Sequence, residues 1–446
     1  MNVMNQKARV ALGLFVFLAT ASLYAEGALV NGWVEIIFLA PVVWLVVSPR
    51  VTDALQNGLV MLAVSCFTVT AADLLLRPML GPYLYSSPIN AYTRQKPELP
   101  VVGRWDSNVS VTGQAYGDIA AITGDIALRV PRQINLTTDA AGFRNDDIRP
   151  PIELLVLGDS FGAGTGVTQE KMLSNLLQSE YGLATYNLSF PGCGPWHQYV
   201  NFAIESSRLN FASHATVVWL LYTGNDLDDQ YGSTWTVEEL PWLSPLTAWH
   251  VSYKTFRRRS PVHQIIENVT WRMKTAKDMK RDVVTAYLSD RRPVLFREVE
   301  EAWGRRLQSD VEQHSNFPKL IRTMTEMKRL TEAKGLRLFV VILPTKGEVY
   351  RWILQGRPPL PEDSAPSGFS QAVFGVCENL RVVCVDPKPW FIQQSKSLLA
   401  EGEMLWWRDD THLNEHGHAS LATFLAKKLH TVERLREHTG DDSHIK

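Results

Sequence analysis

The sequence has few cysteines and no excess of charge of either sign. Only four of its 446 residues are cysteine, and none stands in a CxxC pair, so neither a disulfide scaffold nor a cysteine metal site is expected. Lysine and arginine number 45 against 46 for aspartate and glutamate, which excludes the basic excess that drives nucleic-acid binding. The fold must therefore depend on a hydrophobic core, and we expect no nucleic-acid partner.

Two of the cysteines are near neighbours in the sequence. Cys377 and Cys384 could pair in an oxidising compartment, and two packed free thiols are an equally good interpretation. The sequence assigns them no function.

Long apolar runs crowd the first 80 residues, which are expected to form a membrane segment. Three such runs follow one another, at about residues 10–25, 32–48 and 57–76. Each approaches the roughly 20 residues that a helix needs to cross a bilayer. Lys7 and Arg9 precede the first run and Arg50 lies between the second and third, so the positive-inside rule places both segments in the cytoplasm. The rest of the chain is then expected outside the cytoplasm, in the periplasm if the protein is bacterial.

Two other interpretations of these runs stay open. The first run could be a signal peptide, although its end is a poor small-x-small cleavage site. Its removal would leave two spans and the same exit side. The runs could instead form a buried helical hairpin of a soluble protein, although three in a row are hard to bury.

The remainder of the chain divides into three parts. Residues 81–150 are rich in Gly, Pro, Asn and Thr, with short alternating pieces at 119–122 and 127–130. They predict a linker and a small β-rich lead-in without evident chemistry. Residues 151–430 have the texture of an α/β domain, and 431–446 form a polar tail.

Short β-branched runs alternate with amphipathic helices from residue 152, which indicates a parallel sheet covered on both faces. The expected strands are 153–157, 184–188, 215–221, 336–343 and 381–385. The expected helices include 168–181, 195–209 and 317–334. Gly335 suits the left-handed position after the last of these helices. The predicted fold class is thus a three-layer α/β/α domain with a five-stranded parallel sheet.

A cap insertion at about residues 230–315 interrupts this alternation. It carries three tryptophans and a helical stretch rich in lysine and arginine. The favoured interpretation is a solvated helical cap whose basic side chains face water. The alternative is a lid over the site that attracts an acidic polymer or lipid headgroups.

Ser160 stands where the first strand runs into Gly-Asp-Ser-Phe-Gly, at residues 158–162. A serine on such a turn is exposed, and its backbone amide and the amino end of the next helix point toward an incoming oxyanion. Glycine and serine are also ordinary turn residues. Ser160 is therefore a candidate nucleophile that needs support from other parts of the chain.

Two further polar turns follow the next two strands. Gly192 lets the backbone come close and present its amide, and Asn225 in Gly-Asn-Asp offers a carboxamide donor. Each residue is also good loop chemistry. All three turns follow the carboxyl ends of consecutive strands, which is where ligands bind in open α/β sheets.

A histidine with a nearby carboxylate lies close to the other end of the chain. His412 precedes a helix in the sequence Asp409-Asp410-Thr411-His412. A carboxylate three positions earlier can fold back onto one ring nitrogen and leave the other to take the serine proton. Asp409 is the predicted partner, with Asp410 as the alternative.

The order of these motifs over residues 152–430 resembles the SGNH or GDSL hydrolase family. The resemblance implies Ser160 as nucleophile, His412 as base and Asp409 as its orienting acid. It implies an oxyanion hole made by the Ser160 amide, Gly192 and Asn225. An α/β-hydrolase is disfavoured, because its acid lies well apart from its histidine.

Three more residues are candidates for substrate binding. Lys346 follows Pro-Thr after the fourth strand, a segment that looks like one in SGNH proteins related to alginate acetylation, and could hold an anionic sugar. A solvated loop lysine is the plainer interpretation. Trp406 and Trp407 could stack on a sugar ring, although packing is expected for at least one of them.

The sequence therefore predicts a membrane-anchored serine esterase or O-acetyltransferase without a metal or cofactor. The expected substrate is an ester, most simply O-acetyl, on cell-envelope or exported carbohydrate. Acyl transfer could draw on a membrane acyl-donor protein, and the lipid bilayer is a further partner. The alternatives are a lipid or short-chain ester hydrolase and, in another class, a catalytically silent carbohydrate-binding subunit.

Overall fold

The computed structural model describes residues 93–96, 99–146, 148, 150–229, 231–232 and 282–439, with residues 72, 76, 265 and 266 besides. The three predicted membrane spans lie outside these residues, apart from 72 and 76. Among the helices that are described, none is both long enough and apolar enough to cross a membrane. Most of the predicted cap insertion also lies outside the described part, namely residues 230, 233–264 and 267–281.

The chain divides into two compact units. The smaller unit comprises Met1–Trp105 and Pro241–Lys274, and its described part includes an antiparallel hairpin of β1 (Thr93–Lys96) and β2 (Leu99–Trp105). The larger unit comprises Asp106–Leu240 and Thr275–Lys446. All features discussed below belong to the larger unit.

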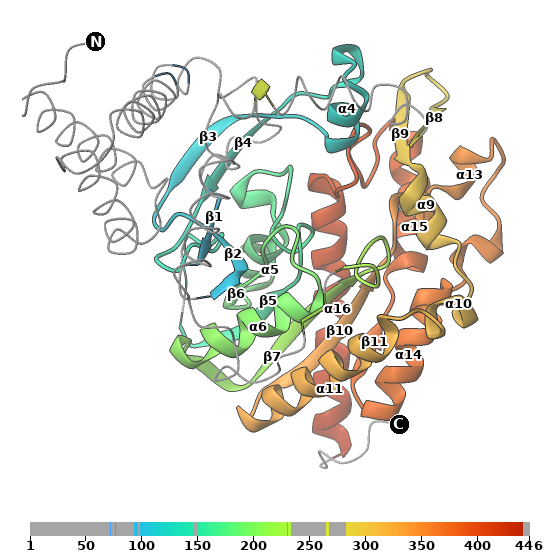
Figure 1. Ribbon diagram of the computed structural model, residues 1–446. Coiled ribbons are helices and arrows are strands. Elements are labelled where there is room, and N and C mark those ends of the chain that lie inside the picture. The colour runs from blue at the N-terminus through green and yellow to red at the C-terminus, as the bar shows by residue number, and fades with distance from the viewer. Residues whose placement is uncertain are drawn as a thin grey trace, which may run out of the picture. The chain divides into compact units, whose positions relative to one another are not determined.

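A five-stranded parallel sheet forms the centre of the larger unit (Figure 1). Its strand order is β11-β10-β7-β5-β6. The strands are β5 (Ile152–Leu157), β6 (Thr185–Asn187), β7 (Phe211–Tyr222), β10 (Arg337–Leu343) and β11 (Val383–Val385). Near-continuous apolar runs suit strands that are buried on both faces. The five predicted strands are confirmed, with ends that differ by up to four residues.

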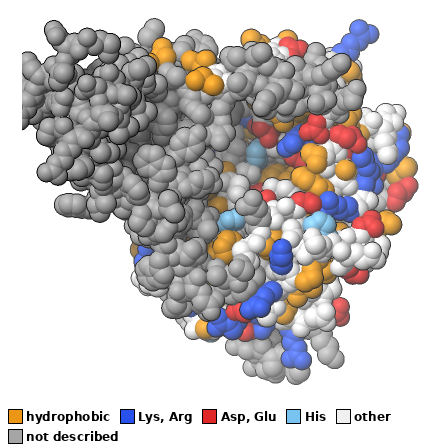
Figure 2. Space-filling model, in the orientation of Figure 1, with side chains coloured by type: hydrophobic (Ala, Val, Ile, Leu, Met, Phe, Trp, Pro, Cys, Tyr) orange, Lys and Arg blue, Asp and Glu red, His pale blue; other side chains and the backbone are white. Residues whose placement is uncertain are grey.

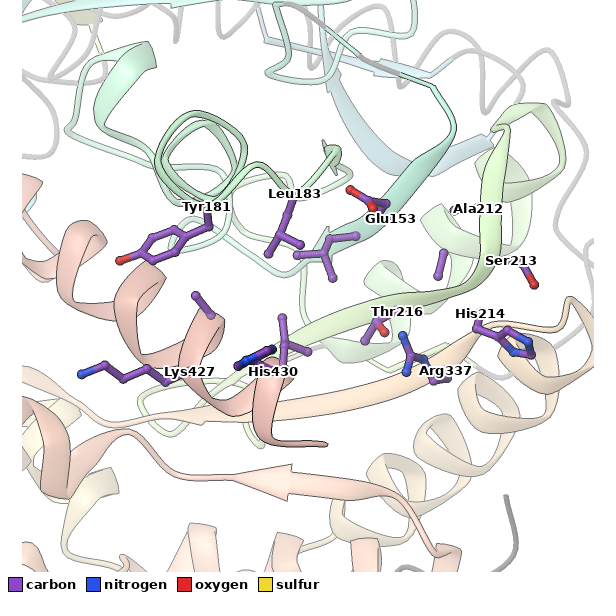
Figure 3. A pocket seen from close by; sticks show the side chains of 14 residues that line it. Glu153, Tyr181, Leu183, Ala212, Ser213, His214, Thr216, Arg337, Lys427 and His430 are labelled. Atoms are coloured by element: carbon purple, nitrogen blue, oxygen red, sulfur yellow. The ribbon is translucent and has the colours of Figure 1, made fainter. Parts of the chain in front are cut away.

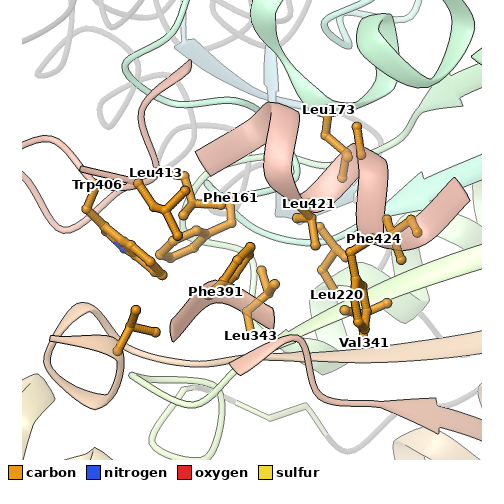
Figure 4. Close-up of a cluster of buried hydrophobic side chains, with 14 of the residues drawn as sticks. Phe161, Leu173, Leu220, Val341, Leu343, Phe391, Trp406, Leu413, Leu421 and Phe424 are labelled. Atoms are coloured by element: carbon orange, nitrogen blue, oxygen red, sulfur yellow. The ribbon is translucent and has the colours of Figure 1, made fainter. Parts of the chain in front are cut away.

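Helices cover both faces of this sheet, and alternate side chains of each strand point to opposite faces. The helices are α5 (Leu173–Tyr181), α6 (Pro195–Glu205), α11 (Phe317–Ala333), α14 (Gly368–Leu380), α15 (Lys388–Ala400) and α16 (Glu415–Thr439). Leu220 and Val341 pack in one cluster with Leu173 and Leu421, from α5 and α16 (Figure 4). Trp219 faces the other way, and its Nε1 donates to Gln198 of α6 at 2.5 Å.

The lead-in, residues 106–138 of the larger unit, contains a hairpin of β3 (Ser110–Ala115) and β4 (Arg132–Thr137). Between these strands lie α4 (Asp118–Thr123) and a 3-10 turn at Ile126–Leu128. The β-rich character was predicted, but the alternating pieces at 119–122 and 127–130 are not strands. Gly117 and Gly124 bracket α4, and Gly124 ends it with φ at +70°.

The described end of the cap insertion is a hairpin followed by two short helices. Its elements are β8 (Val283–Tyr287), β9 (Pro293–Arg297), α9 (Glu298–Gly304) and α10 (Gln308–Glu312). Leu295 of β9 is buried against Ile119 and Ala120 of α4. The hairpin is therefore packed against the lead-in, while the basic helical stretch of the predicted cap, at about 257–281, lies outside the described residues apart from 265 and 266.

Two further features were left open or unforeseen. Cys377 and Cys384 form a disulfide, with their Cα atoms 6.2 Å apart. Residues 431–439, expected as a polar tail, continue α16. On the described face that Figure 2 shows, acidic and basic side chains are interspersed, as the balanced composition predicts.

A cavity of about 470 Å³ lies at the amino ends of the strands (Figure 3). Glu153 of β5, Thr216 of β7 and Arg337 of β10 line it together with Lys427 and His430 of α16. It is at the opposite end of the strands from Ser160, which follows β5.

Candidate active site

Ser160 is held on a tight turn directly after β5. The Asp159 carboxylate is buried and accepts a hydrogen bond from the Phe161 amide at 2.9 Å, which fixes the turn. A side chain at Gly162 would place its Cβ 2.2 Å from Ser189 Oγ, so this position requires glycine. One part of the prediction is wrong: the next α-helix, α5, begins only at Leu173. Its amino end therefore does not follow Ser160 directly.

His412 links Ser160 to a carboxylate. Its Nε2 lies 2.8 Å from Ser160 Oγ, and its Nδ1 lies 2.7 Å from Asp410 Oδ1. The predicted loop before α16 is confirmed, and Asn414 begins that helix by accepting from the Gly417 amide at 3.0 Å. Ser160, His412 and Asp410 thus form one hydrogen-bonded series, although Ser160 and His412 are 252 positions apart in the chain.

Neighbouring charges set the protonation of this series. Burial by itself lowers the pKa of His412, but the charge and hydrogen bond of Asp410, with help from Asp118 and Asp159, raise it to about 9. Burial pushes the pKa of Asp410 upward, but His412 and Arg132 hold it well below its ordinary value. The series is therefore built to carry a positive imidazole ring beside a negative carboxylate.

The predicted orienting acid differs from the observed one. Asp409 Oδ2 accepts from the amides of Gly117 and Val130 at 2.7 and 2.8 Å, and its Oδ1 faces Arg132 at 3.1 Å. Asp410 faces the histidine instead, and its Oδ1 also accepts from the His412 amide at 3.2 Å. The acid that binds the ring is therefore Asp410, two positions before His412. The prediction of Asp409, three positions before it, is wrong.

The three predicted oxyanion donors follow neighbouring strands. Ser160, Gly192 and Asn225 come after β5, β6 and β7, which pair in the order β6-β5-β7. Gly192 is exposed with φ at +72°, a conformation that favours glycine. The side-chain oxygen of Asn225 is buried without a hydrogen-bond partner among the described residues. The sheet therefore brings the three residues to one edge.

Lys346 is not at a rim open to substrate. Its side chain is buried, and its Nζ donates to the carbonyl oxygens of Leu295, Trp407, Arg408 and Asp410, at 2.8 to 3.2 Å. Burial lowers the pKa of Lys346 to about 8, although the negative charges of Asp409 and Asp410 raise it. The lysine ties the acid-bearing loop to β9, so the prediction that it holds an anionic sugar is wrong.

One of the two tryptophans packs inside the protein, as was expected for at least one of them, and stacking of Trp407 on a sugar stays a prediction. Trp406 is 1% exposed and packs edge-on against the rings of Tyr350 and Phe391. Trp407 is half-buried, and the guanidinium of Arg132 lies 4.4 Å from its ring centre. Trp406 is thus a core residue, and Trp407 supports an arginine.

The sequence did not single out Asp118 and Arg132, which come from the lead-in and reach the same loop. Asp118 accepts from the amide and hydroxyl of Thr411 at 2.9 and 2.7 Å, and Arg132 donates to both Asp409 and Asp410. Two adjacent buried carboxylates, Asp409 and Asp410, are stable only beside a positive charge. Nothing in the sequence says which arginine, 277 positions away, supplies it.

Side-chain atoms of Asp118, Asp410 and His412 lie within 4.8 Å of one another. Among the described residues, this is the group close enough to hold an ion. Both ring nitrogens of His412 already face Ser160 and Asp410, so neither is free to bind an ion.

Comparison with known families bears on this architecture. Residues 295–443, about a third of the chain, match the family model described as "SGNH hydrolase-like domain, acetyltransferase AlgX". The fold is SGNH-like. The matched segment includes Asp410 and His412 but not Ser160. No curated protein matches the chain.

Solved structures similar to this chain include an esterase and a protein of the G-D-S-L family. An esterase, EstA from Pseudoalteromonas sp., is 13% identical, with 62% of this chain and 96% of that chain covered and a TM-score of 0.30. A protein of the G-D-S-L family from Desulfitobacterium hafniense is 10% identical, with 61% and 97% covered and a TM-score of 0.29. At such scores these likenesses carry no argument about the site of this chain.

Proposed function

We propose that this protein is a serine esterase or O-acetyltransferase that acts on O-acetyl groups of cell-envelope or exported carbohydrate. The observation that carries the proposal is the hydrogen-bonded series of Ser160, His412 and Asp410. A hydroxyl, an imidazole and a carboxylate in this order are the parts of a nucleophilic triad. The SGNH-like fold and the match to the AlgX-type acetyltransferase model support the choice of an acetyl ester.

The mechanism follows from the positions of these three groups. His412 in its neutral form takes the Ser160 hydroxyl proton at Nε2 as Ser160 Oγ attacks the carbonyl carbon of the ester. The developing oxyanion is stabilised by the amides of Ser160 and Gly192 and the carboxamide of Asn225. The alcohol leaves with the proton from His412, and the acyl group stays on Ser160. Water or a sugar hydroxyl, deprotonated by His412, then takes the acyl group and restores the serine.

A panel of esters tests the proposal. The full chain should release acetate from acetylated oligosaccharides and p-nitrophenyl acetate faster than it cleaves p-nitrophenyl palmitate. An unacetylated oligosaccharide added with the acetyl ester separates transfer from hydrolysis, because transfer yields a newly acetylated sugar. Preference for the palmitate ester would favour a lipid ester hydrolase. No turnover of any ester would favour the silent binding subunit.

We also propose that the domain acts outside the cytoplasm, tethered by the apolar runs of the first 80 residues. The support is the length of these runs and the positions of Lys7, Arg9 and Arg50. A reporter active only after export, fused to the carboxyl end, should give signal. Signal from a cytoplasm-only reporter alone would contradict this placement.

Replacing Asn225 by alanine should lower kcat about a hundredfold to a thousandfold with little change in KM, the usual effect of losing one oxyanion donor. The reason is that the carboxamide meets the oxyanion only as the transition state forms. Asp228→Ala is the matched control on the same loop, since Asp228 lies on the surface and pairs with Arg306. Steady-state kinetics on one acetyl ester decide between the roles: a change in KM alone would make Asn225 a binding residue.

A further inference from the structure

The loop that carries Asp409 to His412 is fastened to the lead-in and not only to the sheet. The amides of Gly117 and Val130 donate to the Asp409 carboxylate, and the Ala120 amide donates to the Asp409 carbonyl at 3.0 Å. A Cβ at Gly117 would lie 1.9 Å from that carbonyl oxygen. The lead-in and the loop are therefore fitted at close range, which the sequence did not reveal.

Arg132 fixes the carboxylate that faces His412. Its side chain is 5% exposed and bridges Asp409 Oδ1 and Asp410 Oδ2. Asp410 Oδ2 is the oxygen that His412 does not use, because Nδ1 faces Oδ1. The ring of Trp407 supports the guanidinium on another side. An arginine has the fork geometry that such a bridge requires, and a lysine does not.

Asp118 brings a second carboxylate to the histidine. Its two oxygens accept from the amide and the hydroxyl of Thr411, the residue between Asp410 and His412. Its carboxylate, that of Asp410 and the His412 ring lie within 4.8 Å of one another. Asp118 is thus close enough to act on the ring by charge without bonding to it directly.

We propose that Arg132 and Asp118 are paired positioning residues of the triad, with Arg132 fixing Asp410 and Asp118 placing a second negative charge beside His412. This inference rests on the proposed function. It means that a segment preceding the SGNH-like sheet completes the acid–base part of the site.

The two residues have opposite effects on the imidazole. The negative charge of Asp118 favours the protonated ring, and the positive charge of Arg132 disfavours it. Burial and the charge of Asp410 raise the pKa of Asp118 to about 6. This is below the value of about 9 for His412, so Asp118 is charged while the histidine titrates. Other charged or titratable groups that face this set are Asp159, Glu300, Lys346, Asp409, Asp410 and His418.

The test compares the pH dependence of kcat/KM in Asp118→Asn and Arg132→Gln. The acid limb of the profile marks loss of the neutral histidine. We expect it to move down by about one pH unit in Asp118→Asn and up by about one unit in Arg132→Gln. The maximal rate should also fall at least about tenfold in Arg132→Gln, because Asp410 loses its second anchor.

Matched controls come from the same lead-in. Asp125→Asn removes an exposed charge and keeps an acceptor for the Ala127 amide, and Arg129→Gln removes a cation that stacks on Tyr116. Both should leave the acid limb in place. If Arg132→Gln fails to fold, Arg132→Lys keeps the charge but not the fork. That variant should slow turnover with the limb unmoved.

Direct titration of the His412 ring separates this inference from the proposed function. Selective histidine labelling and NMR, with His412→Gln to assign the signal among 11 histidines, measure the pKa without any turnover. Opposite shifts in the two variants support the inference even if no ester is found. Shifts in the same direction, or none while both variants stay folded, would overturn it and leave Arg132 and Asp118 as structural residues.

Discussion

Replacing Ser160 by alanine should lower acetyl ester turnover by at least about ten-thousandfold, because no other group supplies the attacking oxygen. The melting temperature should change little, since Ser160 is only partly buried and lies on a turn. His412→Ala should give a loss of similar size, because the serine then has no base. Steady-state kinetics and thermal melting of each variant measure both quantities.

Ser213→Ala is the control for Ser160, since Ser213 is exposed and lines the cavity at the other end of the strands. It should keep wild-type turnover. Near-native activity in Ser160→Ala or His412→Ala would remove the triad from the account.

Replacing Asp410 by asparagine should lower kcat about ten-thousandfold, because an amide cannot stabilise the positive imidazole that forms during the reaction. Asp409→Asn is the matched comparison in the same loop. Asp409 contacts Gly117, Val130 and Arg132 rather than His412, so we expect a loss at least about tenfold smaller than for Asp410. Its main effect should be a lower melting temperature, since a buried carboxylate that accepts three hydrogen bonds is removed.

Comparing kcat of the two variants shows whether the acid two positions or three positions before His412 orients the ring. A larger loss of kcat in Asp409→Asn than in Asp410→Asn would restore the i−3 partner that the sequence favoured.

The sheet could be predicted because its signals are local. Most of the strands contain a short apolar run between turns, and the run is continuous in β10 and in the carboxyl-terminal half of β7. The signal for the left-handed residue after α11 was equally local, and Gly335 has φ at +69° as predicted. The lead-in was harder. A six-residue helix such as α4 gains its stability from packing on Leu295 of β9, which no local pattern contains.

The site was predictable where one residue type and one turn define the role. Ser160 and His412 are in this class, and the structure brings their side chains to 2.8 Å. The choice between Asp409 and Asp410 could not be predicted. Both residues are close enough to His412 in the chain to contact its ring, and their other hydrogen-bond partners decide which of them does. The predicted sugar-binding role of Lys346 was wrong for the same reason, since four carbonyl oxygens from distant segments surround its amine.

The role of Arg132 could not be predicted from the sequence. It lies 278 positions before Asp410, in a stretch that carries no motif, yet it anchors the acid of the series. A buried ion pair of this kind is expensive to break, because the remaining carboxylates stay buried without their cation.

In the proposed mechanism, Ser160 is a nucleophile activated by His412 and Asp410. A fluorophosphonate probe tests this most directly, because it reacts covalently with an activated serine and does not require the natural substrate. We predict labelling of the wild-type chain on the peptide that contains Ser160, no labelling of Ser160→Ala, much slower labelling of Asp410→Asn, and labelling of Asp409→Asn at least about tenfold faster than that of Asp410→Asn. A wild-type chain that is folded and stays unlabelled, or is labelled at another residue, would contradict the account.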